Sequence, residues 1–298
     1  MYRPITSSVR CLAGYSQRAS HHLRRDRVPC DQRLANVVVI SGASGEVGRP
    51  LTNQALESGK FDLVVALTSD AGVEKLQQYG VEHERLLVIN RNEGAISDQL
   101  KEALPRGADK VNLIHSVGGT PKGVCYAYTS DQLRALNQGP AMAMVSSIGE
   151  FALDTRSDTM STVNISSLAA SYLEEVEHCA YSKSRLETEF LVNQKMRELA
   201  SHGMHTHSGS LRVGFVMQEP RKCDKSGLWH FDTGYEGGMH HQANLPFVVG
   251  LGTGSQPIQP LHIKDLTQGA INALDHHSLN SDGFVLDGVT TGNTISTK

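Results

Sequence analysis

The most constraining feature of this 298-residue sequence is an apolar run that ends in three evenly spaced glycines. Residues 37–40 are all β-branched, and glycines follow at positions 42, 45 and 48 before an amphipathic stretch begins. A buried strand that passes through a tight turn into a helix has this pattern. Glycines so spaced permit the turn, a close approach of the backbone to a pyrophosphate, and tight packing of the helix on its strand. The N-terminus of that helix would attract phosphates, although a glycine-rich turn without a ligand is the alternative.

Beyond this turn, short apolar runs alternate with amphipathic segments. Further strands are expected at 62–68, 85–90, 110–115, 159–168, 211–216 and 283–288. Helices are expected at 50–59, 71–79, 96–104, 131–152, 174–200 and 263–274. Regular βα alternation requires right-handed crossovers between parallel strands, so the sequence predicts an α/β fold with one doubly wound parallel sheet. A single domain should span 36–298, with an aromatic-containing segment at about 217–258 that forms either a substrate lid or a disordered insertion.

The composition argues against two classes of binding partner. A net charge of -3 gives no reason to expect a nucleic acid or a membrane surface, and no apolar run approaches the length of a transmembrane helix. The five cysteines lack metal-binding spacing, and their odd number and wide separation indicate free thiols in a reducing compartment. Adjacent histidines occur in three pairs, but neighbouring residues point in different directions, so no metal site is predicted.

The first 35 residues differ from the rest of the chain. Seven arginines are interspersed with hydroxyl residues, and no acidic residue precedes Asp26. Such a segment is typical of a transit peptide, which would direct the protein to the mitochondrial matrix or another organelle. A disordered basic tail on a cytoplasmic protein is the alternative. In either case residues 1–35 are expected to lie outside the fold.

Three separated patches resemble the short-chain dehydrogenase/reductase family. They are the glycine turn, the sequence Asn-Ile-Ser-Ser at 164–167, and Tyr-Ser-Lys-Ser-Arg at 181–185. The resemblance implies a single-domain Rossmann-fold enzyme that transfers hydride between NAD(P) and a small carbonyl or alcohol. It also implies a homodimer or homotetramer that pairs through the long helices. It does not identify the substrate.

The resemblance assigns roles to four residues. Ser167 would hydrogen-bond the substrate oxygen as charge develops. Tyr181 would be the general acid/base, which needs an adjacent cation to work near neutral pH. In the family that cation is a lysine four residues after the tyrosine, and this chain has Arg185 at that position. Lys183 would point about 200° away from Tyr181 on a helix. Asn137 resembles the asparagine that helps relay protons, although a polar residue on a core helix is the alternative.

The cofactor would be held by several loops at the ends of strands. Thr68 and Ser69 end the second strand, where an acid would favour NAD and hydroxyls tolerate the 2′-phosphate of NADP. Asp70 lies one residue further on, and Arg49 is able to pair with a phosphate, so the sequence favours NADP only slightly over NAD. The expected cofactor-binding residues are Gly42, Ser44, Gly45, Glu46, Val47, Gly48, Thr68, Ser69, Asn90, Ser116, Gly118 and Arg185.

Three hypotheses about function follow. The first is an NAD(P)-dependent oxidoreductase, for which Ser167 and Tyr181 argue. The second is a nucleotide-binding scaffold or sensor with weak or no catalysis, for which Arg185 argues. The third is a sugar-nucleotide epimerase or dehydratase, which suits the glycine spacing but requires a larger substrate domain than the chain after 216 provides.

Overall fold

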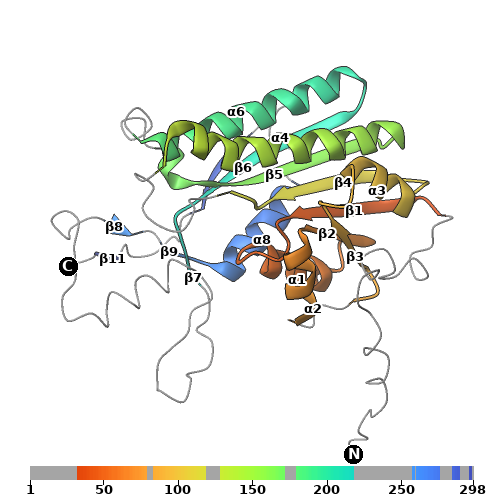
Figure 1. The fold of residues 1–298 in the computed structure, drawn as a ribbon, viewed down its shortest axis with the longest axis horizontal. Coiled ribbons are helices and arrows are strands. Elements are labelled where there is room, and N and C mark those ends of the chain that lie inside the picture. The colour runs from red at the N-terminus through yellow and green to blue at the C-terminus, as the bar shows by residue number, and fades with distance from the viewer. Residues whose placement is uncertain are drawn as a thin grey trace, which may run out of the picture.

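A computed structural model describes residues 32–78, 83–118, 128–171, 179–217, 257–258, 260–275, 284–288 and 295–296. Its centre is a seven-stranded sheet in which all neighbouring strands run parallel, in the order β10-β6-β5-β4-β1-β2-β3 (Figure 1). The strands are β1 (Leu34–Ser41), β2 (Leu63–Thr68), β3 (Leu86–Asn90), β4 (Ala108–His115), β5 (Thr159–Ser167), β6 (His205–Val213) and β10 (Phe284–Gly288). The prediction of a doubly wound α/β fold is confirmed.

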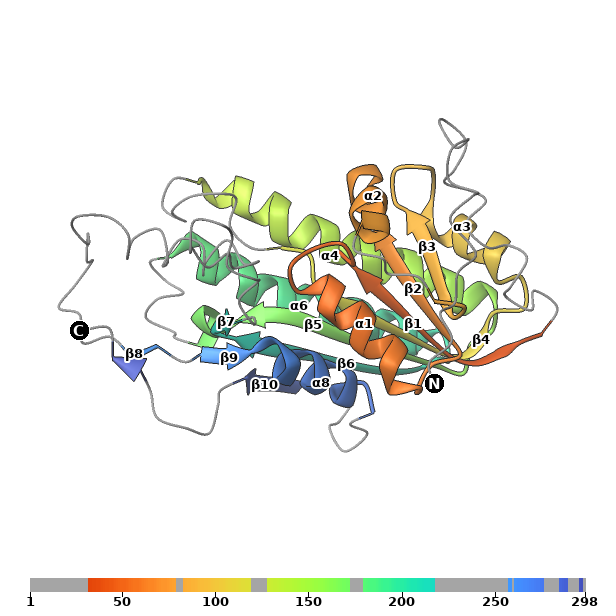
Figure 2. The same cartoon turned by 90° about the horizontal axis from the view of Figure 1, so that it is seen from below.

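Helices cover both faces of the sheet (Figures 1 and 2). One face carries α3 (Ile96–Ala103), α4 (Ser130–Asp154) and α6 (Ala180–Ser201). The other carries α1 (Gly48–Ser58), α2 (Asp70–Gln78) and α8 (Ile263–Ala273). The central strands are therefore buried on both sides, which explains their continuous apolar sequences. In β1, for example, Val37 and Val39 face the α4 side while Val38 and Ile40 face the α1 side.

Most expected elements lie within a few residues of their predicted positions, but two boundaries were wrong. Helix α6 begins at Ala180, because the backbone of Cys179 is extended (φ -114, ψ 110), so the predicted helix 174–200 is not continuous. Residues 174–178 of that prediction lie outside the described residues. Strand β6 begins at His205, six residues before its predicted start. Its first half is polar in sequence, yet it pairs with β5 along its whole length.

Shorter elements lie beside the main sheet. Strands β7 (Phe215–Met217) and β9 (Pro260–His262) pair in parallel, and β8 (Pro257–Ile258) pairs antiparallel with β11 (Ile295–Ser296). A 3₁₀ turn, η2 (Leu168–Ser171), follows β5.

Two sequence predictions fall mainly outside the described residues. The predicted lid at 217–258 lies there except for its two ends, as does the basic extension up to residue 31. Strand β1 begins at Leu34, so the last two residues of the predicted extension belong to the fold. Among the helices of the described residues, none combines the length and apolar character needed to cross a membrane.

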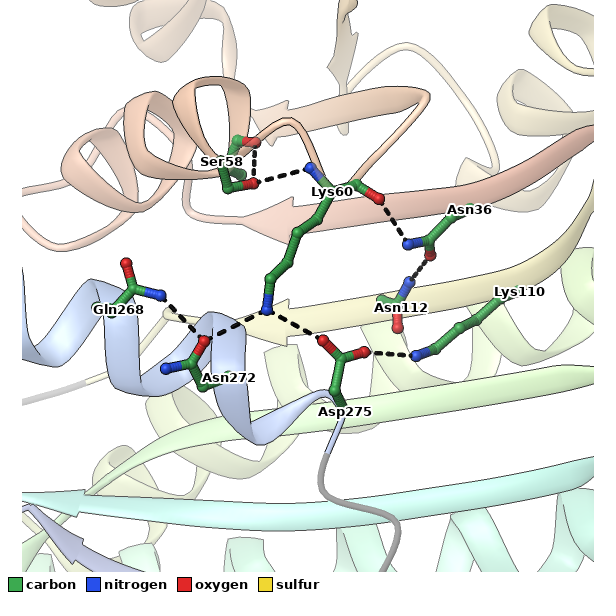
Figure 3. Close-up of polar contacts among 9 residues, drawn as sticks. Asn36, Ser58, Lys60, Lys110, Asn112, Gln268, Asn272 and Asp275 are labelled. Carbon is green, nitrogen blue, oxygen red and sulfur yellow. Dashed lines mark hydrogen bonds and ion pairs between the residues drawn. The ribbon is translucent and has the colours of Figure 1, made fainter.

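A polar network fastens α8 to the amino-terminal edge of the sheet (Figure 3). Asp275, just after α8, accepts from Lys110 Nζ at 2.9 Å and from Lys60 Nζ at 3.1 Å. Lys60 also donates to Asn272 Oδ1, and its own carbonyl accepts from Asn36 at the start of β1. The network lies at the edge opposite the carboxyl ends of the strands.

Candidate active site

The candidate site lies where the chain changes direction in the sheet. After β1 the chain continues to β2 and β3 on one side, and it then crosses back to place β4 on the other side of β1. In open parallel α/β sheets, ligands bind beyond the carboxyl ends of the strands at such a switch point. The predicted site residues are carried by these strand ends and by the turns and helices that follow them.

The glycine turn between β1 and α1 has the geometry that its sequence predicts. Gly42 has a φ of +73, and a Cβ on Gly48 would lie 2.0 Å from the Gly42 carbonyl oxygen. A side chain at Gly48 would therefore collide with backbone. The N-cap of α1, Val47, makes no side-chain capping bond, and the first turn of α1 contains no acidic residue. These features fit a diphosphate against the helix N-terminus.

At the end of β2, a carboxylate and two hydroxyls are held in place. The hydroxyls of Ser44 and Thr68 lie 2.6 Å apart, while Ser69 precedes α2. Asp70 opens α2 and accepts hydrogen bonds from the side chains of Asn92, at 2.8 Å, and Asn90. Those bonds, that from Asn92 foremost, lower the pKa of Asp70, which is therefore anionic at neutral pH.

Asn90 thus has a different environment from the one expected. Its side chain is 5% exposed, and its amide donates to Asp70 and also, at 3.1 Å, to Glu93. Its oxygen accepts from the backbone N–H of Asn92. The structure therefore gives Asn90 the role of orienting Asp70, and its predicted contact with the cofactor stays a prediction.

The loop after β4 connects the glycine turn with the helices α4 and α6. Ser116 Oγ donates to the carbonyl of Ser41 at 2.6 Å. Gly118 has a φ of +125, and a Cβ there would lie 2.4 Å from Arg185 Nη1 and 2.7 Å from Asn137 Oδ1. Only a glycine allows this backbone to lie against both side chains.

Arg185 and Asn137 form a buried cluster behind this loop. Arg185 is 5% exposed, and it donates from Nη1 to Asn137 Oδ1 at 3.1 Å and from Nη2 to the Ile165 carbonyl. Asn137 in turn donates to Ser184 Oγ and to the Leu133 carbonyl. The structure therefore brings together Asn137, Arg185 and Gly118. The two hydrogen bonds that the Arg185 guanidinium donates end on α4 and on β5.

Ser167 and Tyr181 lie at the same edge of the sheet. Ser167 ends β5, is half-buried, and accepts a hydrogen bond from the Ala169 N–H at 3.3 Å. Tyr181 is half-buried in the first turn of α6. Lys183 is exposed on that helix, whereas Arg185 is buried, so the two side chains lie on different faces, as the helical spacing predicts.

A buried histidine underlies the site. His115 ends β4, and its Nδ1 lies 2.8 Å from Ser41 Oγ. Burial, reinforced by the charge of Arg185, lowers the pKa of His115 to about 3. Asn164 is the register partner of His115 on β5 and is equally buried. His115 is therefore a neutral member of a polar row that crosses β1, β4 and β5.

A second buried cluster was missed by sequence reasoning. Glu189 on α6 forms an ion pair with Arg212 on β6 and accepts a hydrogen bond from Ser166 Oγ at 2.5 Å. Its position four residues after Arg185 and eight after Tyr181 places all three on one helix face. That spacing was the only available signal in the sequence, because the pairing of Glu189 with Arg212 depends on the sheet register.

Comparisons with solved structures show which proteins share this fold. A putative β-ketoacyl-ACP reductase is 15% identical over 87% of this chain and 98% of its own, with a TM-score of 0.56. A short-chain type dehydrogenase/reductase from Mycobacterium ulcerans is 15% identical over 86% of this chain and 90% of its own (TM-score 0.55). UDP-glucose 4-epimerase from Thermotoga maritima is 14% identical over 88% of this chain and 79% of its own (TM-score 0.58).

No protein-family model and no curated protein sequence matches the chain. At these identities, the structural likeness establishes the Rossmann-type fold and nothing finer.

Proposed function

We propose that this protein is an NAD(P)-dependent oxidoreductase of the short-chain dehydrogenase type, acting on a small carbonyl or alcohol. The observation that carries the proposal is the contact of Gly118 with both Asn137 and Arg185. Gly118 follows the strand at the switch point, and Arg185 lies one helical turn from Tyr181. This arrangement supports a single site in which a nucleotide cradle lies beside a candidate acid/base, as hydride transfer requires.

Each part of the site has a role in this reaction. A bound nicotinamide dinucleotide supplies or accepts the hydride. The glycine turn and the N-terminus of α1 hold its diphosphate. Ser167 hydrogen-bonds the substrate oxygen, and Tyr181 donates a proton to that oxygen or removes one. Arg185 and Asn137 hold the start of α6 in place through their hydrogen bond.

The carboxylate of Asp70 supports NAD over NADP as the cofactor. The sequence slightly favoured NADP on the hydroxyls of Thr68 and Ser69, but the Thr68 hydroxyl is already hydrogen-bonded to Ser44. Asp70 is held in its anionic form at the end of β2, where the adenosine ribose binds in this fold. A carboxylate accepts hydrogen bonds from a ribose 2′-OH and repels a 2′-phosphate.

A nucleotide-binding scaffold is the second candidate function. The observation that favours it is the environment of Arg185, whose guanidinium donates to Asn137 and Ile165 within a buried cluster. A cation held in this way has less freedom to assist Tyr181 than a flexible lysine would have.

The test is a pair of fluorescence titrations with NADH and NADPH, followed by turnover of a carbonyl panel. We expect NADH to bind, and Tyr181→Phe to retain that binding while turnover falls by about 10²-fold or more. Lys183→Gln is the matched control on the exposed side of α6, and it should keep both properties. A protein that binds neither dinucleotide would sink the proposal.

The variant Arg185→Lys separates the two candidate functions. If NADH binds but the natural protein reduces no carbonyl, the scaffold function is supported. Activity that appears in Arg185→Lys alone would then identify the arginine as the cause of the lost catalysis.

A further inference from the structure

We propose that the buried ion pair between Glu189 and Arg212 positions Ser167 for catalysis. This inference rests on the function proposed above, since only an oxidoreductase of that type assigns a catalytic role to Ser167. Neither member of the pair is a candidate for contact with the cofactor or the substrate. Each acts through the turn that carries the serine.

The pair is largely shielded from water, with Glu189 the more deeply buried member. Arg212 Nη2 lies 2.7 Å from Glu189 Oε2, and Arg212 Nε lies 3.0 Å from Oε1. The two side chains are 15% and 4% exposed. Burial of such a pair carries a desolvation penalty that apolar residues of similar volume avoid. Stability alone is therefore a weak explanation for two charges at this position.

The hydrogen bonds of the pair indicate what it holds. Ser166 Oγ donates to Glu189 Oε1 at 2.5 Å, and Arg212 Nη1 donates to Ser171 Oγ at 3.3 Å. Ser166 directly precedes Ser167, and Ser171 is the last residue of η2, the turn that follows. The ion pair is thus attached to the chain on both sides of Ser167.

The same pair connects the serine turn with the helix that carries Tyr181. Glu189 lies on the inward face of α6, two helical turns after Tyr181 and one after Arg185. The relative placement of the two candidate catalytic hydroxyls therefore depends on this connection. Small errors in such placement reduce rates strongly, because the reaction needs aligned groups at short range.

The experiment uses the full chain and two variants, Ser166→Ala and Glu189→Gln. Ser166→Ala removes only the hydroxyl that joins the strand to the ion pair. Glu187→Gln is the matched control, because Glu187 lies on the same helix and pairs with Arg134 at 3.1 Å, away from β5. The measurements are kcat and KM for carbonyl reduction, the Kd for NADH, and hydrogen–deuterium exchange of the amides of 167–171.

We expect both variants to lower kcat by about tenfold or more, with an NADH Kd within about twofold of the natural protein. Exchange at 167–171 should be faster in both variants and unchanged in Glu187→Gln. If Glu189→Gln does not fold, the result for Ser166→Ala tests the proposal by itself.

Unchanged exchange at 167–171 would overturn the proposal, and so would faster exchange with an unchanged kcat. A natural protein that turns over no carbonyl would instead refute the proposed function. In that case exchange still shows whether the ion pair fixes the serine turn.

Discussion

Arg185 and His115 are two ionisable side chains that lie buried behind the candidate site. Arg185 is 5% exposed and His115 is fully buried. Because burial and the nearby guanidinium both disfavour a second positive charge, His115 stays neutral at physiological pH. The buried cluster behind the candidate site therefore carries one cation, on Arg185.

The neutral state of His115 makes stability depend on pH. Its pKa is about 3 in the folded protein and near 6.5 in the unfolded chain, so the unfolded chain binds more protons between these values. We expect the free energy of unfolding to fall as the pH drops below 6.5, with a slope that approaches about 1.4 kcal/mol per pH unit. Urea denaturation at several pH values between about 5 and 7 measures this slope.

His115→Gln is the comparison for this prediction, because glutamine takes up no proton in either state. Its stability should change less over the same pH range. Parallel curves for the two proteins would contradict the prediction.

Asp70 is expected to select the cofactor. Replacing it with asparagine removes the charge that opposes a 2′-phosphate, so Asp70→Asn should shift the ratio of NADH to NADPH affinity by about tenfold toward NADPH. Parallel fluorescence titrations measure this ratio. Glu74→Gln removes a charge from the next turn of α2 and serves as the control. An equal shift in both variants would indicate a general charge effect instead.

Among the elements, the turn between β1 and α1 has little tolerance for added atoms. At Gly48 a methyl group would meet the Gly42 carbonyl at 2.0 Å and the Ala43 Cα at 2.9 Å. Since both neighbours are backbone, the turn itself would have to move. This constraint links the stability of the element to its ability to bind phosphate.

We therefore expect Gly48→Ala to reduce the free energy of unfolding by about 1–3 kcal/mol and to abolish NADH binding. Gly269→Ala is the matched control, because a Cβ at this helical glycine of α8 would have its nearest neighbour, Leu211, at 3.9 Å. That variant should gain roughly 0.5–1 kcal/mol and bind NADH normally. Thermal melting and NADH titration of both variants test this prediction. Equal stability and equal NADH affinity in the two variants would contradict it.

The elements also show what a sequence is able to predict. Apolar strands such as β2 and β4 were located within two residues because burial on both faces leaves a continuous signal. The first half of β6 was missed because residues 205–210 are mostly polar, and the sheet, not their own hydrophobicity, holds them. In the candidate site too, some features could be predicted from the sequence and others could not.

Local patterns predicted the glycine turn and the placement of Lys183 and Arg185 on different faces of one helix. By contrast, the acceptors of Arg185 and the ion pair of Glu189 depend on which strands become neighbours. That information is not present in the spacing of residues along one segment.

For the molecule as a whole, the Asp275 network joins α8 to the amino-terminal edge of the sheet (Figure 3). Partial burial acts to raise the pKa of Asp275, but hydrogen bonds from Lys110 and Lys60 outweigh it and lower that pKa. The resulting stabilisation is present above the unfolded pKa near ~3.9 and is lost as the pH falls through the lower folded value.

Asp275→Asn should reduce the free energy of unfolding by roughly 0.5–1 kcal/mol at low ionic strength, since the carboxylate is 47% exposed and therefore screened. The difference should shrink at high salt. NADH affinity should not change, because the network lies at the far edge from the site. A salt-independent loss in denaturation experiments would contradict the electrostatic origin.

The pairing of β10 with β6 has a consequence for biosynthesis. Within the part of the chain that the structure describes, the strand that pairs with the outer side of β6 is β10, which comes late in the chain. Until translation reaches residues 284–288, the nascent protein presents β6 as an open edge, with unpaired backbone groups able to recruit strands from other chains. A ribosome that stalls or a nonsense codon before Phe284 would therefore release a species prone to aggregation, even though every residue of the candidate active site had already been made.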